Sequence, residues 1–498
     1  MIPLPIATFG GLLWAATSAQ AALQVDLNNP ASLRKAASQV AYDLMTFYSG
    51  NQTGKIPGIL PGPPPGGDYY WWEGGALWGT MIDYWLYTGD ESYIPTTMQS
   101  LIFQSGPPQH AYMPDNWTAS LGNDDQGFWG MSAMLAAETM FPDPPSNGNQ
   151  PGWLELAQAV FNTQAAPERH DSTCGGGMRW QIPQFNIGYD YKNSIANGIF
   201  FNLGARLARY TSNTTYSDYA EQTWDWMAAV GLMDDAINVY DGAHVQTNCT
   251  DVFKAQFSYN AGVLIQGAAF MYNVSTGATQ SKWKSRLDRL IDRTIAVFFE
   301  TGPMIEISCE LPDQIRCKTD MLSFKGYVHR WMANAVKVAP YLHDKVMNTL
   351  RVSAAAAVSS CSGGANGRIC GFRWNTGKYD GLTGAGQQMN ALAAIMTLLV
   401  DLEDIRPPVT NSTGGTSKGD PDAGGEANLF RVHKEITAAD RAGAGILTAL
   451  WLAFCIGLFG FITGGFGEGR RVIVLNNGAG GGGRKGIQGL LEGLRRRM

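Results

Sequence analysis

The chain has 498 residues, 45% of them hydrophobic and 16% charged, so it can bury a large core and is not disordered in general. A formal charge of −6 leaves no concentrated basic face, which argues against a nucleic-acid partner. The supply of 15 tryptophans and 19 tyrosines suits a sugar ligand, whose C–H faces stack on aromatic rings.

The first 21 residues have the pattern of a secretory signal peptide. An apolar stretch from Ile6 to Ala16 precedes Ala19-Gln20-Ala21, which is a small-x-small cleavage signature. No lysine or arginine precedes the apolar stretch, so an N-terminal core helix is the alternative. We predict a signal peptide at 1–21 and a folded domain at 22–406.

Six segments of this domain share a polar start followed by an apolar helical run almost free of charge. They begin near Trp71, Asp124, Lys192, Phe257, Phe324 and Gly384. Helices that are apolar on nearly every side are buried on nearly every side. More amphipathic stretches alternate with them, at Ala31–Tyr48, Tyr93–Gln104, Trp153–Gln164, Tyr216–Val230, Lys282–Phe299 and Leu342–Val358.

This alternation, with a unit of about sixty residues, predicts a repeat architecture. Twelve helices in two concentric rings would form an all-α (α/α)6 barrel, with the apolar set inside. The polar starts of the inner helices would then gather at one end of the barrel, where we expect a pocket. An irregular helical domain or a helical solenoid is the alternative.

Cysteines and glycosylation sequons both indicate export. Six cysteines precede the C-terminal apolar segment: Cys174, Cys249, Cys309, Cys317, Cys361 and Cys370. Short loops favour Cys309–Cys317 and Cys361–Cys370, leaving Cys174–Cys249, although six cysteines allow fifteen pairings. Sequons begin at Asn51, Asn116, Asn213, Asn248, Asn273 and Asn411. The histidines are dispersed and no CxxC pair occurs, so we predict neither a metal site nor a cofactor.

The strongest candidates for chemistry are the adjacent carboxylates Asp124 and Asp125, which open the second inner segment. Acidic residues at a helix start have an ordinary role as caps, but one carboxylate is enough for a cap. Adjacent Cα atoms are about 3.8 Å apart, so the carboxyls can stand about 5 Å apart, the spacing of retaining glycosidases. Like charges so close raise the pKa of one carboxyl, which can then act as acid beside an ionised nucleophile.

Other polar or aromatic residues at the starts of inner segments are candidate substrate-binding residues. They are Trp72, Glu73, Trp129, Lys192, Asn193, Asn260 and Lys325. For each of them, core packing, helix capping or a structural ion pair is the alternative role. A second acidic pair, Asp234-Asp235, follows an outer helix and is interpreted as a loop or cap feature.

The composition changes beyond the domain. Residues 407–441 are rich in Gly, Ser, Thr and Asp and predict a solvated stalk. Residues 442–466 are apolar and uncharged, long enough to cross a hydrocarbon layer of about 30 Å. A basic tail follows at 467–498. Two types of membrane attachment remain open: a single span with a cytoplasmic tail, or a glycosylphosphatidylinositol (GPI) signal with its attachment site near Gly424-Gly425.

The run NDDQGFWGMSAMLAAE resembles the catalytic motif of glycoside hydrolase family 76, the endo-α-1,6-mannanases. WWEGGALWG, Tyr259-Asn260-x-Gly262, Phe324-Lys325-Gly326 with Arg330, and GAGQQMNALAAI are also similar to family segments. The resemblance covers about Val25 to Arg406 and is greatest to the fungal, GPI-anchored cell-wall branch, from whose usual ending the basic tail departs.

The resemblance implies an (α/α)6 barrel that acts on α-1,6-linked mannan or GPI-core glycan by a retaining double displacement. Asp124 would be the nucleophile and Asp125 the general acid/base. Wall glucan is an expected acceptor if the enzyme transfers rather than hydrolyses. The alternatives are a glycan-binding wall protein without catalysis and an inverting barrel glycosidase.

Overall fold

A computed structural model describes residues 22–145, 150–425 and 438–463 of the chain. The predicted signal peptide (1–21) and basic tail (467–498) lie outside the described residues. The chain divides into two compact units, Met1–Ala427 and Asn428–Met498.

Among the described residues of the first unit, six helices form a closed inner ring in which each packs on the next and the last packs on the first. They are α2 (Trp71–Thr88), α4 (Asn123–Thr139), α6 (Ser194–Thr211), α8 (Ser258–Val274), α10 (Phe324–Val338) and α12 (Ala385–Met396). Glycine permits close approach between neighbours: a Cβ on Gly75 would stand 2.8 Å from the ring of Trp129. Nearly all residues of these helices are buried, as their all-round apolarity predicts.

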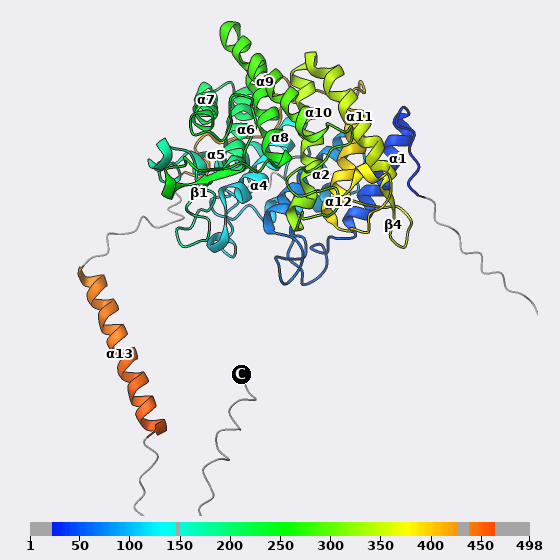
Figure 1. The fold of residues 1–498 in the computed structure, drawn as a ribbon. Helices are drawn as coiled ribbons and strands as arrows, with labels where there is room; N and C mark the ends of the chain where they lie inside the picture. Colours follow the sequence, from blue (N-terminus) through cyan, green and yellow to red (C-terminus); the bar gives the residue numbers. More distant parts are fainter. Residues whose placement is uncertain (1–21, 146–149, 426–437, 464–498) are drawn as a thin grey trace, which may run out of the picture. The chain divides into compact units, whose positions relative to one another are not determined.

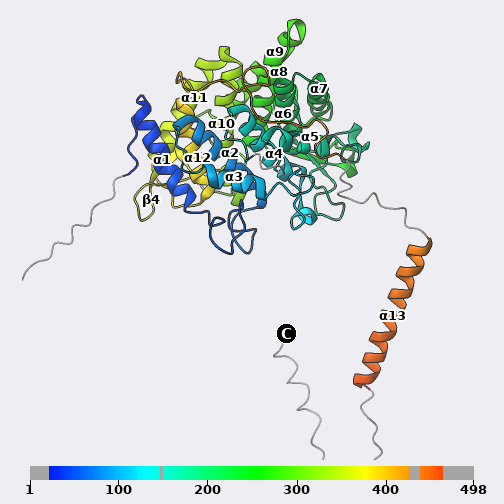
Figure 2. The ribbon, with the colours of Figure 1, turned by 180° about the vertical axis from the view of Figure 1, so that it is seen from behind.

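A second set of helices surrounds this ring. They are α1 (Pro30–Met45), α3 (Ile94–Phe103), α5 (Trp153–Ala165), α7 (Thr214–Ala229), α9 (Gly277–Phe298) and α11 (His343–Ser359). Each packs an apolar face on the inner ring, and α1 lies beside α12 although they come from opposite ends of the domain, as Figures 1 and 2 show from two sides. The arrangement fits the predicted (α/α)6 barrel.

Short strands and 3-10 turns occur in the connecting loops. The strands are β1 (Tyr191–Asn193), β2 (Gly242–His244), β3 (Val252–Phe253), β4 (Cys361–Gly363) and β5 (Ile369–Cys370). The turns are η1 (Thr118–Ser120), η2 (Pro167–Arg169), η3 (Thr173–Gly175), η4 (Val245–Thr247), η5 (Thr319–Ser323), η6 (Pro340–Leu342), η7 (Trp374–Thr376) and η8 (Thr397–Leu399). Strands β1, β2 and β3 form an antiparallel sheet in which Lys192 faces Ala243, so the start of α6 is tied to the loop before α8.

The structure contains three disulfides, Cys174–Cys249, Cys309–Cys317 and Cys361–Cys370, which is the pairing that loop length favoured. The asparagine of every predicted sequon is exposed, as a glycan would require. Their glycosylation stays a prediction.

The structure describes the first half of the predicted stalk, whose side chains are mostly exposed. Residues 408–425, here called the C-terminal strap, lie against the outside of the barrel. Val409 donates its N–H to the carbonyl of Glu138 at the end of α4. Ser417 accepts the N–H of Leu154 at the start of α5, and Asn162 donates to the carbonyl of Ala423. The strap stays in place because its polar backbone satisfies groups at a helix end that would otherwise be unpaired.

The predicted membrane segment 442–466 coincides largely with α13 (Ala438–Thr463) of the second unit. The large apolar side chains Ile446, Leu450, Trp451 and Phe454 are each more than half exposed. No helix among the described residues combines the length and the hydropathy that a membrane crossing requires. The span at 442–466 is not confirmed and stays a prediction.

Candidate active site

Asp124 and Asp125 lie in the first turn of α4, at the end of the barrel where the inner helices begin. This place favours negative charge, because the unpaired N–H groups of a helix start carry partial positive charge. The Asp125 Oδ2 atom accepts the N–H of Gly122 at 2.7 Å, and the Asp124 Oδ1 atom accepts the N–H of Asp125 at 3.0 Å. Both side chains are therefore held in fixed orientations.

Gly122 lies close to both carboxyls, so its position limits the distance between them. A Cβ on this glycine would be 2.4 Å from Asp124 Oδ1 and 3.0 Å from Asp125 Oδ2. Those two oxygens can be no farther apart than the sum of the two distances. This upper limit is compatible with the ~5–5.5 Å of retaining glycosidases and lies below the ~6.5–9.5 Å of inverting ones.

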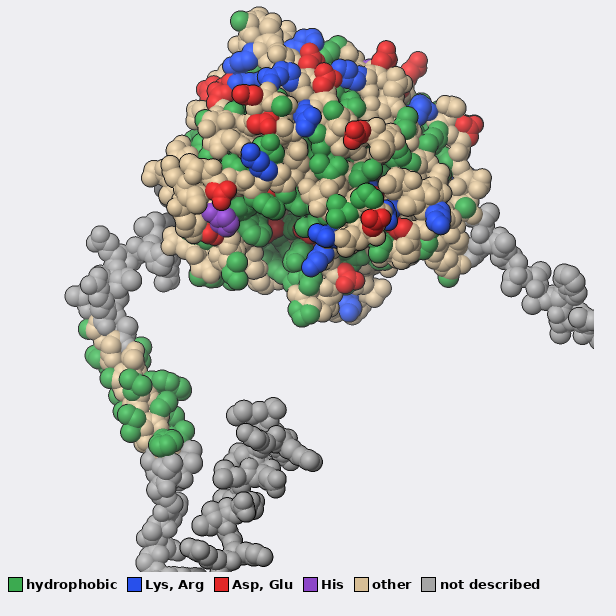
Figure 3. Space-filling view, viewed as in Figure 1, with side chains coloured by type: hydrophobic (Ala, Val, Ile, Leu, Met, Phe, Trp, Pro, Cys, Tyr) green, Lys and Arg blue, Asp and Glu red, His purple; other side chains and the backbone are tan. Residues whose placement is uncertain are grey.

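The surface is hollowed in the region where α4 and β1 lie, with hydrophobic side chains around the opening and acidic side chains at its floor (Figure 3). We call this end of the barrel the mouth. Asp124 retains 8% of its exposure and Asp125 is partly exposed. A small polar ligand with apolar faces, such as a sugar, fits a site of this character.

The pKa values of both carboxyls are raised. Burial raises the pKa of Asp124 well above its ordinary value, as does repulsion from Asp125, while a hydrogen bond from Asn193 Nδ2 to Asp124 Oδ2 at 3.2 Å lowers it. Burial raises the pKa of Asp125 to about 6, although the Gly122 N–H lowers it. The pair therefore shares a proton well into the range where isolated aspartates are ionised.

Three further acidic residues lie on segments at the same end of the barrel as the pair, two of them beside the starts of α2 and α10. Glu73 is fully buried, and burial and the charge of Asp320 raise its pKa well above the ordinary value. Burial raises the pKa of Asp320 to about 6. Asp241 accepts the hydroxyl of Tyr191 at 2.7 Å. No sequence pattern marks Asp320, because it lies in η5, before the apolar run of α10 begins.

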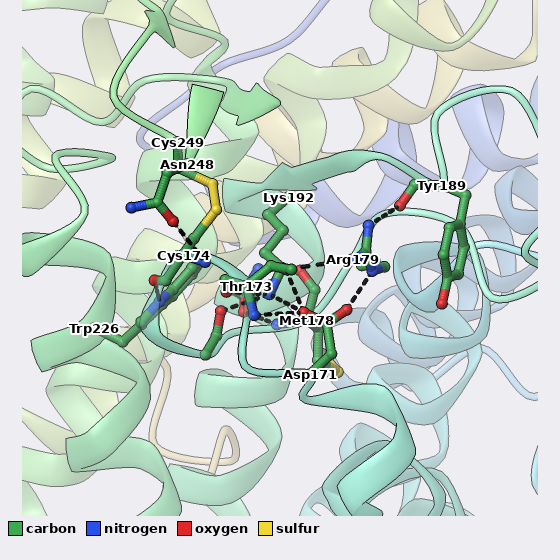
Figure 4. Close-up of polar contacts among 12 residues, drawn as sticks. Asp171, Thr173, Cys174, Met178, Arg179, Tyr189, Lys192, Trp226, Asn248 and Cys249 are labelled. Atoms are coloured by element: carbon green, nitrogen blue, oxygen red, sulfur yellow. Dashed lines mark hydrogen bonds and ion pairs between the residues drawn. A yellow bond between two sulfur atoms is a disulfide. The ribbon is translucent and has the colours of Figure 1, made fainter. Parts of the chain in front are cut away.

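Lys192 does not face the mouth, and its predicted sugar contact is wrong. Its fully buried ammonium pairs with Asp171 at 3.1 Å and donates to the carbonyls of Thr173 at 2.8 Å and Gly176 at 2.7 Å (Figure 4). Arg179 also pairs with Asp171. Burial alone would raise the pKa of Asp171, but hydrogen bonds from Thr173, Arg179 and Lys192 lower it to about 2. The network folds the loop between α5 and β1 back on itself.

This loop in turn positions the start of α4. The disulfide Cys174–Cys249 ties it to the loop after β2, and Asn248 accepts the N–H of Cys174 at 3.2 Å (Figure 4). At its other end, the carbonyl of Trp180 accepts the N–H of Asn123 at 2.8 Å. Asn123 directly precedes Asp124, so this hydrogen bond fixes the position of the acid pair relative to the loop.

Lys325 is also a structural residue rather than a sugar ligand. It is fully buried, pairs with Glu310 at 2.7 Å and donates to the carbonyl of Phe372 at 2.8 Å. Its ammonium lies 4.2 Å from the centre of the Phe372 ring. Both charged groups of this ion pair are fully buried among the surrounding loops, so neither is accessible to a substrate.

The aromatic candidates belong to the core. Trp129 is fully buried between Trp71, at a ring-centre distance of 5.1 Å, and Tyr112, at 5.5 Å. Trp72 packs on Phe128 at 4.3 Å below the mouth. The structure therefore contradicts an exposed sugar platform at Trp129.

The remaining candidates take different positions. Asn193 caps α6 and donates to Asp124, so it acts on the acid pair. Asn260 is fully buried in the first turn of α8, near Asp241. The second acidic pair is a turn feature, as predicted: Asp234 accepts N–H groups of Ala236 at 3.0 Å and Asn238 at 2.8 Å.

Among the residues that the structure describes, no group of three or more His, Cys, Asp and Glu side chains could hold a metal ion. The chemistry available at the mouth is that of carboxyls, amides and phenols. A closely spaced carboxyl pair at the floor of a surface hollow, at the end of a helical barrel, is the arrangement of a glycoside hydrolase of the helical-barrel class.

The chain belongs to glycosyl hydrolase family 76, whose family model matches residues 32–412. It is 43% identical to the mannan endo-1,6-alpha-mannosidase DCW1 of Saccharomyces cerevisiae, over 89% of this chain and 98% of the relative. It is 38% identical to the mannan endo-1,6-alpha-mannosidase DFG5 of the same yeast, over 88% of this chain and 93% of the relative. It is therefore an enzyme of the glycoside hydrolase class.

Solved structures agree on the fold. The crystal structure of Dfg5 from Chaetomium thermophilum in complex with glucosamine is 55% identical, has a TM-score of 0.76, and covers 80% of this chain and 97% of its own. An inactive variant of the α-1,6-mannanase from Salegentibacter sp., in complex with α-1,6-mannotriose, is 14% identical, has a TM-score of 0.57 and covers 74% of this chain and 100% of its own. At that identity the likeness is one of fold.

Proposed function

We propose that the protein cleaves or transfers α-1,6-mannosidic linkages in mannan or GPI-core glycan, by way of a covalent intermediate on Asp124. The observation that carries the proposal is the closely spaced pair Asp124–Asp125, buried at the mouth and sharing a proton. Its relatives' names support the substrate class. The inactive Salegentibacter mannanase carries asparagine at two consecutive aspartates, which supports the choice of residues.

In the first step the Asp124 carboxylate attacks C1 of a mannose residue while Asp125 donates its proton to the departing oxygen. The C1–oxygen bond breaks and a mannosyl ester forms. In the second step Asp125 takes a proton from water or from an acceptor hydroxyl, whose oxygen attacks C1 and releases Asp124. Water gives hydrolysis and a wall-glucan hydroxyl gives transfer, and both keep the α-configuration.

Asp124→Asn and Asp125→Asn should each lower turnover of an α-1,6-mannooligosaccharide by about 10²-fold or more, because each removes a carboxyl that reacts. Asp235→Asn is the matched control, since this exposed turn residue lies in the second acidic pair and should leave turnover unchanged. The product should first appear as the α-anomer in an NMR time course.

Equal activity of all three variants would refute the assignment of the pair. Tight mannan binding without product or trapped intermediate would favour a glycan-binding protein, and a first-formed β-anomer would favour an inverting enzyme. Adding a glucan acceptor to the assay distinguishes transfer from hydrolysis.

The protein is also proposed to act outside the plasma membrane, attached to it and serving the fungal cell wall. The leader pattern, the three disulfides and the exposed sequon asparagines support export. The apolar segment at 442–466 supports attachment, either by a GPI anchor or by a span. Release from membranes by a GPI-specific phospholipase would select the anchor, and recovery in the soluble fraction without any treatment would contradict attachment.

A further inference from the structure

A groove on the outside of the barrel lies between the end of α5 and one face of α7. It consists of two adjoining pockets of about 260 Å³ and about 340 Å³, which share Ala165 and Tyr219 as lining residues. We call the two pockets together the outer groove. The larger pocket is within the size range of small-molecule sites, and no residue of the outer groove forms a hydrogen bond with Asp124 or Asp125.

The lining of the outer groove is uncharged and partly aromatic. None of the described residues that line it is Asp, Glu, Lys or Arg. One face of α7 supplies Tyr219, Gln222 and Trp226. The Tyr219 hydroxyl and the Gln222 amide have no hydrogen-bond partner among the described residues. Aromatic faces beside unpaired polar groups, without a charge, match a neutral sugar chain.

One end of the outer groove is formed by Asn213, the asparagine of a predicted glycosylation sequon. Its Oδ1 atom accepts the N–H of Thr215 at 3.0 Å and so caps α7. Its Nδ2 atom, to which a glycan would be joined, has no hydrogen-bond partner in the described part of the chain. By contrast, Nδ2 of Asn273 in another sequon donates to the carbonyl of Val338 at 2.8 Å. Asn213 can therefore carry a glycan and keep its cap.

The course of α7 brings the outer groove within reach of such a glycan. Tyr219 lies about 9 Å farther along the helix than Asn213, at a rise of 1.5 Å per residue, and the first sugars of an N-linked glycan span that distance. The Tyr219 ring is half-buried, and the small side chains of Ala165 and Ala166 line the pocket beside it. Pro421 of the C-terminal strap lines the same pocket.

We propose that the outer groove binds the protein's own N-linked glycan, attached at Asn213, whose core sugars pack on Tyr219. The opposite end of the groove is formed by Gly175–Gly177 and Trp226, which donates its Nε1–H to the carbonyl of Cys174 at 3.0 Å (Figure 4). A glycan that fills the groove thus contacts the strap at one end and, at the other, the loop that positions the acid pair. The inference does not depend on the proposed function.

Protein secreted by a yeast host tests the proposal without any measurement of turnover. Glycopeptide mass spectrometry should find Asn213 occupied. Endoglycosidase H, which cuts within the core of high-mannose glycans, should release this glycan from the folded protein about 10-fold more slowly than the glycan of Asn51, which lies in an exposed loop. Tyr219→Ala should remove most of this difference.

Thermal unfolding gives a second measurement. Thr215→Val removes the sequon but keeps the cap, because Asn213 accepts the backbone N–H of residue 215. We expect the melting temperature to fall by about 2 °C, and to fall less when Tyr219 has already been replaced by alanine, since the two changes then remove the same contact. Thr53→Val, the same change in the sequon of Asn51, is the matched control and should leave the melting temperature unchanged.

The proposal would be overturned by an unoccupied Asn213, or by release of its glycan as fast as that of Asn51. An equal loss of stability in Thr215→Val with and without the Tyr219 ring would also contradict it, because the loss would then come from the valine itself. A free oligosaccharide would be the occupant instead if protein without a glycan at Asn213 bound α-1,6-mannotriose at a second site that Tyr219→Ala removes.

Discussion

Asn193 links the fold to the chemistry at the scale of a single residue. Its Oδ1 atom accepts the N–H of Ala196 and so caps α6, while its Nδ2 atom donates to Asp124. The hydrogen bond favours the ionised form of Asp124, the form that a nucleophile requires. One side chain thus contributes to the stability of a helix and to the reactivity of the acid pair.

Asn193→Ala should lower kcat by roughly 10- to 100-fold, the value of a hydrogen bond to a charged group, and lower the free energy of unfolding by about 1 kcal/mol through the lost cap. Kinetics and thermal unfolding measure the two effects. Asn29→Ala removes a comparable cap from α1, far from the mouth, and should cost similar stability without loss of kcat. An unchanged kcat in Asn193→Ala would contradict its role at Asp124.

The sequence located the residues at helix starts but not the direction of their side chains. Asp124 and Asp125 could be predicted because two adjacent acids exceed what a cap needs. The predicted sugar contacts of Lys192 and Lys325 are wrong. Each lysine pairs with a carboxylate, Asp171 or Glu310, that lies in an irregular loop outside any periodic pattern. No local pattern reveals whether a lysine at a helix start points toward the mouth or back into such a loop.

At the scale of elements, the inner helices were predictable and the C-terminal strap was not. A completely buried helix can be recognised in the sequence, because nearly all sides of α2, α4 and α8 are apolar. A strap that binds through its backbone leaves no such mark. Its Gly, Ser, Thr and Asp residues have the composition of a solvated linker.

A chain that ends after residue 406 should melt roughly 5 °C or more below one that ends after residue 425. The shorter chain loses the acceptors for the first N–H groups of α5 at Leu154 and Glu155, and the partners of Asn162. Thermal unfolding of the two chains tests this. Equal melting temperatures would show that the strap lies on the barrel without stabilising it.

At the scale of the whole molecule, the buried carboxyls set how stability depends on pH. Burial raises the pKa of Glu306 to about 7, and the carboxyls at the mouth are raised as well. A carboxyl whose pKa is higher in the folded than in the unfolded state stabilises the fold when protonated, and this contribution is lost as pH rises from about 4.5 toward 7. Buried His329, whose pKa is lowered to about 3, acts in the opposite sense below pH 6.5. The carboxyls with raised pKa values outnumber this histidine, so their effect on stability is the larger one.

We therefore expect a higher melting temperature at pH 5.5 than at pH 7.5. Glu306 is the best probe, because it is fully buried and accepts the hydroxyl and N–H of Ser258 at the start of α8. Glu306→Gln should reduce the difference between the two pH values by about 2 kcal/mol at most in the free energy of unfolding. Denaturant titrations at both pH values measure it, and a difference as large as in the wild-type protein would exclude Glu306 as a contributor.

The C-terminal strap connects the end of α4 with the side of α5. It begins at Val409, bonded to Glu138 near the end of α4, and finishes beside Asn162 of α5. The next residue, Thr163, accepts the side chain of Gln126, which directly follows Asp125. The strap therefore ends against the turn of α5 that is bonded to the first turn of α4, the turn that carries the acid pair. A change in the last residues of the strap should reach the acid pair through these two hydrogen bonds.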